Sequence, residues 1–300
     1  MDKPLWMWAG FFGVVVALLV FDLGLLHRKE RDISVRDSLL LSVGYIAVAL
    51  CFGFAVMHYI GLKAGKDFFT GYFVEESLSM DNILVMSMVF SHFMIPRRYQ
   101  HRVLFWGILG VVLLRGAMIG LGVLLIERFH VVLYLFGAFL VVTGLRMLFL
   151  PEYQKTMEEN KILAWLRRRI PVTASLHGKQ FFAYENMKRK ATPLLLVLLF
   201  IELVDIVFAV DSVPAVFAIT TDSFVVYTSN IFAILGLRAL YFALAAMLHR
   251  FAYLKYALSL VLVFIGGKIF LAPHISSGWS LAVTLALLLG GIGVSLYKTR

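Results

Sequence analysis

Nine apolar runs dominate this chain, and each is long enough to cross the hydrocarbon core of a bilayer, about 30 Å thick, as a helix. The runs lie at 5–26, 38–60, 68–90, 103–126, 130–150, 194–218, 224–247, 255–272 and 279–297. Hydrophobic residues occupy 61% of the 300 positions and charged residues only 15%, which is a membrane composition. Lipid offers no partners to backbone groups, so such spans must be helical. We therefore predict an all-α polytopic membrane protein with about nine transmembrane helices, in a single transmembrane domain over residues 1–300.

The distribution of positive charge predicts the orientation of these helices. The net charge of +10 would by itself fit a nucleic-acid-binding protein, but the basic residues are divided unevenly among the connecting segments. With the N-terminus outside, 20 Lys and Arg residues fall in cytoplasmic segments and four in outer segments. Because cytoplasmic loops are enriched in Lys and Arg, the sequence predicts an N-out, C-in protein. Its surroundings are the lipid bilayer, and we expect no nucleic-acid partner.

Two of the apolar runs carry the same acidic motif. It consists of an acid, five further residues, an Asp and then an amide or hydroxyl side chain. The two copies are Glu75, Asp81 and Asn82, and Asp205, Asp211 and Ser212. A carboxylate at bilayer depth costs roughly 2.5–3.5 kcal/mol, so it persists where it is paired, lines a cavity or has a function. Two matched copies suggest one cation site built from two halves.

Further polar landmarks recur after each copy of the motif. An arginine follows in the next apolar run, as Arg115 and Arg238, and glycine with a base follows in the run after that, at Arg146 and Lys268. A three-helix unit that is repeated directly must insert upside down the second time, and inverted repeats place substrate sites between them near the midplane. The chain then divides into repeat 1 at 68–150, a cytoplasmic loop at 151–193, repeat 2 at 194–272 and a terminal helix at 273–300.

The candidate metal ligands are the oxygen-bearing side chains of the two acidic runs. They are Glu75, Glu76, Asp81, Asn82, Glu202, Asp205, Asp211 and Ser212. Oxygen ligands suit magnesium, calcium or manganese, whereas zinc and copper favour imidazole and thiolate. Arg115, Arg238 and Asp22 are expected to surround the ligands as neutralising or supporting groups. An alternative stays open, in which the arginines form a salt-bridge lattice with the acids and no ion is bound.

A proline distinguishes the two halves. Residues six apart on an unbroken helix point about 120° away from each other, so Asp205 and Asp211 would not converge on one ion. Pro214 removes the hydrogen bond to the carbonyl of Val210, and the first repeat has no matching proline. We therefore predict a locally broken helix in repeat 2 and two unequal half-sites.

Nothing in the sequence indicates an enzyme or a resident cofactor. Cys51 is the only cysteine, so there is no disulfide framework and no thiolate metal site. The sequence contains no nucleophile elbow, zinc-protease helix or nucleotide-binding motif. We expect no catalytic residues and a transport step coupled to a gradient. Protons are the natural coupling ion, because carboxylates can exchange a proton for a metal.

The 151–193 loop contains one basic amphipathic segment. Ile162, Trp165, Leu166 and Ile170 alternate there with lysine and arginine residues. This pattern predicts a helix that lies on the cytoplasmic surface of the membrane.

Three motifs resemble the TerC family of integral membrane proteins, and most closely its Alx-type manganese exporters. They are Glu75-x5-Asp81-Asn82, Glu202-x2-Asp205-x2-Phe208-Ala209-x-Asp211-Ser212-x-Pro214-Ala215 and Ser229-Asn230-x-Phe232-Ala233-Ile234-Leu235-Gly236-Leu237-Arg238. The resemblance covers nearly the whole chain. It implies a relative of the LysE-type exporters that exports manganese(II) across the plasma (inner) membrane. In the family pattern the first acid of the Glu75-Glu76 pair is the characteristic one, so Glu76 ranks below Glu75 as a ligand.

Two other classes of function stay open. The first is a membrane-assembly or metal-delivery factor that associates with the secretion machinery through the 151–193 loop. The second is a membrane protein of tellurite or stress resistance that transports no metal.

Overall fold

The computed structural model of the protein describes residues 3–26, 35–149, 161–185, 188–245, 253–271 and 275–298, without the side chains of 23–26, 35, 81 and 271. Its helices are α1 (Leu5–Leu26), α2 (Val35–Tyr59), α3 (Leu62–Leu78), α4 (Met80–His92), α5 (Arg97–Arg128), α6 (Val131–Phe149), α7 (Lys161–Arg169), α8 (Pro193–Phe217), α9 (Ser223–Leu244), α10 (Leu254–Leu271) and α11 (Ser277–Lys298). Seven of these helices are long and apolar enough to span a membrane. The pair α3 and α4, together with α10, completes the nine predicted runs. The predicted all-α polytopic membrane fold is confirmed.

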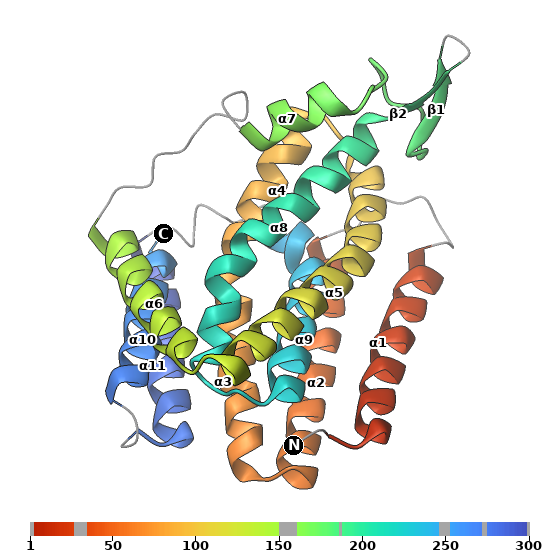
Figure 1. Ribbon diagram of the computed structural model, residues 1–300. Coiled ribbons are helices and arrows are strands. Elements are labelled where there is room, and N and C mark those ends of the chain that lie inside the picture. The colour runs from red at the N-terminus through yellow and green to blue at the C-terminus, as the bar shows by residue number, and fades with distance from the viewer. Residues whose placement is uncertain are drawn as a thin grey trace.

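Most of the long helices run between two opposite ends of the bundle (Figure 1). α7 and a short hairpin of β1 (Phe182–Glu185) and β2 (Lys188–Ala191) lie at one end, and the N-terminus lies at the other. At that second end Lys3 Nζ forms an ion pair with Asp222 Oδ2 at 2.9 Å, just before α9 begins. This arrangement places the basic segments around α7 and the hairpin together at the end that the sequence predicts to be cytoplasmic.

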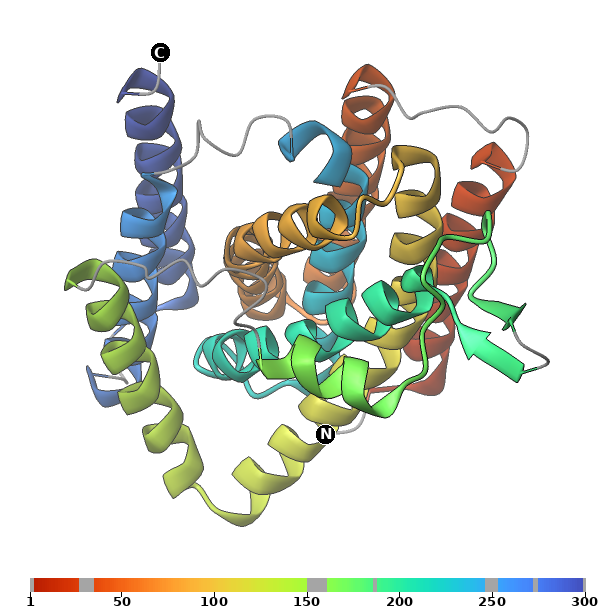
Figure 2. The same cartoon turned by 90° about the horizontal axis from the view of Figure 1, so that it is seen from above.

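The two predicted repeats pack against each other reciprocally. α3 of repeat 1 packs on α9 of repeat 2, while α5 of repeat 1 packs on α8 of repeat 2. The third helices, α6 and α10, pack along each other and stand with α11 as a layer at one side of the bundle (Figure 2). Exchanging the two repeats leaves this pattern of helix pairs unchanged, which is the relationship expected of inverted repeats.

Glycines set the close approach of α6 and α10. A Cβ on Gly266 would lie 2.7 Å from the carbonyl oxygen of Gly137, and a Cβ on Gly144 would lie 2.7 Å from that of Ser259. Small residues allow transmembrane helices to approach this closely. The glycines that mark the third helix of each predicted repeat therefore serve the contact between the repeats.

The helix break falls in repeat 1, and the prediction that Pro214 breaks the helix of repeat 2 is wrong. α8 runs without interruption through Pro214, which lies in its last turn, so the loss of one hydrogen bond to the Val210 carbonyl does not break the helix. The first repeat is instead interrupted at Ser79, between α3 and α4. Just before the break, the Ser77 hydroxyl donates to the carbonyl oxygen of Phe73 at 2.7 Å, and such bonds to the preceding turn bend helices.

α7 confirms the predicted amphipathic helix but contacts protein with its apolar face. Leu163 and Leu166 are buried, and they pack with side chains of α4, α5 and α8. Trp165 is 54% exposed and points away from this contact. The predicted helix is present. The sequence pattern placed its apolar face on the membrane surface, whereas its buried leucines cover the end of the helix bundle.

Candidate functional site

Arg115 lies at the centre of the bundle, only 1% exposed, between carboxylates from the two repeats. It reaches this position from α5, which packs on both α8 and α9. Its Nη1 donates to Glu75 Oε1 at 2.7 Å. Its Nε and Nη2 donate to the two carboxylate oxygens of Asp205 at 3.1 and 3.3 Å. One guanidinium thus joins an acid of repeat 1 to the matching acid of repeat 2.

Neutral polar groups complete what we call the Arg115 cluster, which consists of Glu75, Ser79, Asn82, Arg115, Asp205, Ser212 and Asn230. Arg115 Nη1 also donates to Ser212 Oγ at 2.7 Å and to Asn230 Oδ1 at 3.3 Å. Asn82 Nδ2 donates to Asp205 Oδ1 at 3.4 Å, and Ser79 Oγ donates to Glu75 Oε1 at 3.4 Å. The break at Ser79 therefore lies within the cluster.

Several atoms of the Arg115 cluster are buried without a hydrogen-bond partner among the described residues. They include two acceptor oxygens, Glu75 Oε2 and Asn82 Oδ1. A cavity of about 10 Å³ lies beside Asn82 and Asp205, which is close to the volume that one water molecule needs. With both carboxylates ionised, the one guanidinium would leave one net negative charge on the cluster. A buried, negatively charged site with free oxygen acceptors has the chemistry to attract a hard cation.

The structure brings four of the predicted ligands into this cluster and places others outside it. Glu75, Asn82, Asp205 and Ser212 converge, as the sequence predicts. Asp211 does not: the opposite charge that acts on it is Arg146 of α6. Because α8 is unbroken, the six-residue spacing turns Asp211 away from Asp205. The side chain of Asp81 lies outside the described residues.

Glu202 and Arg238 form a second polar group beside the Arg115 cluster, with Glu202 three residues before Asp205 in α8. Arg238 Nη2 lies 4.0 Å from Glu202 Oε1, and Arg238 Nη1 donates to the carbonyl oxygen of Leu104. The Glu202 carboxylate lies against Gly107 and Gly110, where a Cβ on Gly110 would approach its Cδ to 2.6 Å. Arg238 was expected near the predicted ligands as a neutralising group, and the acid that lies beside it is Glu202 of its own repeat.

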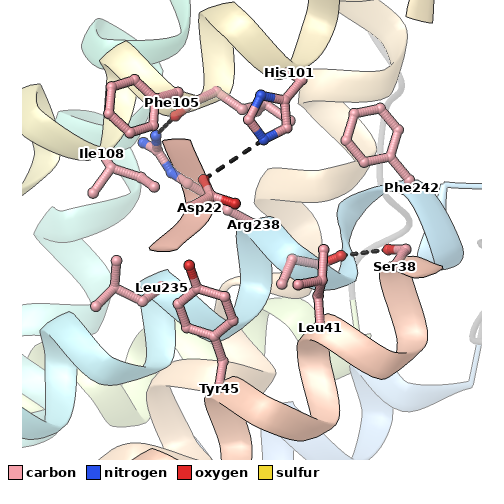
Figure 3. A pocket seen from close by; sticks show the side chains of 12 residues that line it. Asp22, Ser38, Leu41, Tyr45, His101, Phe105, Ile108, Leu235, Arg238 and Phe242 are labelled. Atoms are coloured by element: carbon pink, nitrogen blue, oxygen red, sulfur yellow. Dashed lines mark hydrogen bonds and ion pairs between the residues drawn. The ribbon is translucent and has the colours of Figure 1, made fainter. Parts of the chain in front are cut away.

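A small cavity adjoins Arg238 and contains Asp22, the third predicted supporting residue (Figure 3). Its volume of about 30 Å³ is enough for about two water molecules. His101 Nε2 lies 3.6 Å from Asp22 Oδ2, and the side chain of Tyr45 points into the same space. This polar pocket brings α1, α2, α5 and α9 together beside the second polar group.

Glu76 is separated from Glu75 although the two are adjacent in sequence. Its carboxylate lies toward α9, where a Cβ on Gly236 would be 3.5 Å from Glu76 Oε2 and 3.6 Å from the Tyr72 hydroxyl. Both Glu76 oxygens and that hydroxyl are buried without hydrogen-bond partners among the described residues. Glu76 therefore faces a different part of the interior from the other predicted ligands.

The sequence reasoning missed three polar residues of the interior. Asn230 lies within the third family motif but was not assigned to the site. Asp67, 2% exposed, interacts with Lys268 of α10. The predicted span begins at residue 68 and therefore leaves Asp67 out. The helix itself, α3, begins six positions earlier, at Leu62, and so includes it. His101, near the start of α5, lines the cavity that contains Asp22.

No group of three or more His, Cys, Asp or Glu side chains is spaced to hold a metal ion in the described part of the chain. In the Arg115 cluster the guanidinium occupies the space between the two carboxylates. A cation that uses both of them must therefore displace Arg115, for which Ser212 and Asn230 are alternative acceptors.

The two reciprocally packed repeats and the buried charged cluster between them define a polytopic helical membrane protein with a polar centre. The sequence pattern of the Integral membrane protein TerC family matches residues 60–300. The chain belongs to this family, as its motifs predict.

Curated relatives match over almost the full length of both chains. An uncharacterized membrane protein of Myxococcus xanthus is 46% identical over 296 residues, which cover 98% of this chain and 93% of the relative. One from Rickettsia bellii is 43% identical over 97% of each chain. A protein of Photorhabdus laumondii named Alx, described as a proposed membrane-bound redox modulator, is 42% identical over 94% of this chain and 92% of its own. No solved structure matches this chain.

Proposed function

We propose that this protein is a secondary transporter that exports manganese(II) from the cytoplasm across the bacterial inner membrane, with the Arg115 cluster as its ion site. The observation that carries the proposal is the joining of Glu75 and Asp205, one from each repeat, by a single buried guanidinium. Charged groups inside a membrane mark ion pathways. Sites between inverted repeats are used by transporters that alternate their access.

In the proposed mechanism Arg115 and the transported ion compete for the same carboxylates. When the ion binds, Glu75 and Asp205 turn their oxygens toward it. Arg115 keeps its hydrogen bonds to Ser212 and Asn230, which accept from it at 2.7 and 3.3 Å. When the ion leaves, the guanidinium replaces it, so the two carboxylates are not left buried without an opposite charge.

The donor atoms support a hard divalent ion as the substrate. The Arg115 cluster offers carboxylate, amide and hydroxyl oxygens. Such ligands suit magnesium, calcium and manganese. Manganese is chosen within this group on the family resemblance of the three motifs.

The experiment uses purified protein in liposomes that contain a manganese-sensitive dye. We expect manganese entry with the wild type, and loss of at least 90% of the initial rate in both Glu75→Gln and Asp205→Asn. Glu185→Gln is the matched control, because Glu185 pairs with Lys190 in the hairpin, far from the cluster. Equal rates in protein-containing and protein-free liposomes would refute the proposal, as would wild-type rates in both site variants.

One observation favours a second candidate, an assembly or metal-delivery factor that docks a partner at the cytoplasmic end. The hairpin presents Phe182 and Tyr184, which are exposed, beside the basic residues Lys188 and Arg189. This candidate predicts that Phe182→Ser with Tyr184→Ser abolishes manganese tolerance in cells while Asp205→Asn leaves it intact. The transporter predicts the reverse. The redox role in the name of the Alx relatives could not use a disulfide within this chain, which has one cysteine.

A further inference from the structure

The cavity around Asp22 and His101 contains a pair of groups that the proposed ion site does not use. His101 Nε2 lies 3.6 Å from Asp22 Oδ2, which is longer than an ordinary hydrogen bond. Two atoms at this separation can both bind one metal ion at about 2.1–2.2 Å, with an angle of about 110–120° at the ion. The cavity of about 30 Å³ lies beside them, and Tyr45 points into it (Figure 3). The pair is therefore spaced for a metal ion that keeps water as its other ligands.

The surroundings of His101 differ from those of two other described histidines. His92 Nε2 lies 3.4 Å from Arg167 Nη2, and His177 Nδ1 lies 3.1 Å from the carbonyl oxygen of Ser175. His101 instead lies beside a carboxylate and a cavity. Imidazole and carboxylate together form a common ligand set for divalent metal ions.

The pair lies near the end of the bundle that the sequence predicts to be cytoplasmic. Asp22 is four residues before the end of α1, and His101 is four residues after the start of α5. Four helical residues span about 6 Å. The side chains of Asp22 and His101 are 12% and 20% exposed, whereas that of Glu75 is completely buried. An ion from the cytoplasm can therefore reach this pair before it reaches the Arg115 cluster.

The guanidinium of Arg238 also lines the cavity, but it is engaged by other groups. Its Nη2 lies 4.0 Å from Glu202 Oε1, and its Nη1 donates to the carbonyl oxygen of Leu104. With Asp22 and Glu202 ionised, this one guanidinium would leave one net negative charge around the cavity. The charge of the site therefore favours a cation.

α5 connects the cavity to the Arg115 cluster. It contains His101 near its start and Arg115 fourteen residues later. Fourteen residues are close to four turns, so the two side chains lie on nearly the same side of α5, about 21 Å apart along its axis. Between them, a Cβ on Gly107 would lie 2.8 Å from Glu202 Oε1 and 3.0 Å from Arg238 Nη1. Polar groups thus follow one another along α5 from the cavity to the cluster.

We propose that Asp22 and His101 form an entry site, which binds the divalent ion from the cytoplasm before it passes to the Arg115 cluster. This inference rests on the proposed function. Imidazole is a ligand for transition-metal ions, whereas magnesium and calcium prefer oxygen, and magnesium gives up its water reluctantly. The entry site therefore selects against magnesium and calcium. Its two protein ligands bind weakly enough for the ion to leave again, which passage through a membrane protein requires.

Two sites of different chemistry in series select manganese more sharply than either one. The entry site alone would also accept zinc and copper, which bind nitrogen ligands more tightly than manganese does. The Arg115 cluster offers only oxygen ligands, which suit manganese better than zinc or copper. Manganese accepts both kinds of ligand, so it can pass both sites.

The test measures manganese binding to purified protein by electron paramagnetic resonance, with Asp205→Asn as the parent so that the Arg115 cluster is altered. We expect the parent to bind manganese, and the affinity to fall on the order of tenfold or more when His101→Gln removes one of the two protein ligands. His92→Gln is the matched control, because it makes the same replacement beside Arg167, and it should leave the affinity unchanged.

A third variant tests selectivity. His101→Glu replaces the imidazole with oxygen, so the ratio of manganese to magnesium affinity should fall on the order of tenfold. This ratio is measured on one sample by displacing manganese with magnesium, so it does not depend on how much of the sample is folded.

The outcomes separate the inference from the proposed function. Equal manganese affinities in the parent and His101→Gln overturn the entry site, as does an unchanged ratio in His101→Glu. Manganese flux in wild-type liposomes together with either result leaves the transporter standing without this entry site. Manganese binding that depends on His101, without any flux in the wild type, overturns the transporter and the entry role, and leaves a metal site.

Discussion

Two adjacent glycines of α10 face opposite surroundings and provide a sharp test of how the repeats are held together. A Cβ on Gly266 would lie 2.7 Å from the Gly137 carbonyl oxygen and 2.9 Å from Leu140 Cβ. A Cβ on Gly267 would meet nothing within 4 Å. Both positions lie inside the same helix, so any effect of alanine on helix formation applies to both.

The expected magnitudes follow from this difference. Alanine stabilises a helix interior by about 1 kcal/mol relative to glycine, so Gly267→Ala should raise the free energy of unfolding by up to that amount. Gly266→Ala should gain the same but lose about 1–3 kcal/mol through overpacking against α6. The two variants should therefore differ by about 1–3 kcal/mol, with Gly266→Ala the less stable.

The assay is reversible unfolding of the two purified variants in one detergent, followed by steric trapping or by denaturant titration. Comparing the variants with each other removes the helix-propensity contribution, whose size in detergent need not match its size in water. Equal stabilities would refute the close approach of α6 and α10 at Gly137. A less stable Gly267→Ala would refute the assignment of which face of α10 meets α6.

Three further perturbations test other parts of the structure. Arg115→Ala leaves Glu75 and Asp205 buried without their opposite charge and should destabilise the protein by about 3–5 kcal/mol. Adding Glu75→Gln and Asp205→Asn should restore most of that stability in the same unfolding assay, and no recovery would show that the guanidinium does not serve these acids. Gly110→Ala should displace the Glu202 carboxylate and lower the free energy of unfolding by about 1–3 kcal/mol. At Gly120 a Cβ meets nothing within 4 Å, so Gly120→Ala should not lower it. Similar losses of stability in both variants would contradict the packing of Glu202 on α5. Leu166→Ala should weaken the packing of α7 on the bundle by about 2–5 kcal/mol and speed proteolysis within 161–193. Trp165→Ala should leave the cleavage rate unchanged. A wild-type cleavage rate in both variants would mean that Leu166 does not hold α7 to the bundle.

The sequence could predict the spans and the meeting of the two acidic motifs, because hydropathy, length and repeat order are local signals. It could not predict the partners of the buried charges. Arg115 was expected around the site, yet it lies between the carboxylates, and only the packing of α5 on both α8 and α9 decides which acids its long side chain reaches. The amphipathic pattern of α7 could not distinguish lipid from protein as the surface that Leu163 and Leu166 cover.

The helix break and the charged groups near the span ends escaped prediction for a different reason. Proline is a strong sequence signal, but it removes one hydrogen bond without having to interrupt a helix, and Pro214 leaves α8 intact. The break at Ser79 arises beside a serine that bonds to the preceding turn, a weak signal in a sequence. Asp67 lies beyond the apolar run, so a hydropathy boundary excluded a side chain that the fold buries.

The contacts of Arg115 also determine how late in synthesis its hydrogen bonds can form. Four of its five hydrogen bonds go to Asp205, Ser212 and Asn230, which are made 90 or more residues later in the chain. At the usual pace of synthesis, about 5–20 residues per second, the guanidinium waits on the order of 5–20 s with Glu75 as its one early partner. The first half of the protein therefore enters the membrane as an unfinished structure, and newly made chains should be most exposed to quality-control proteases during that interval.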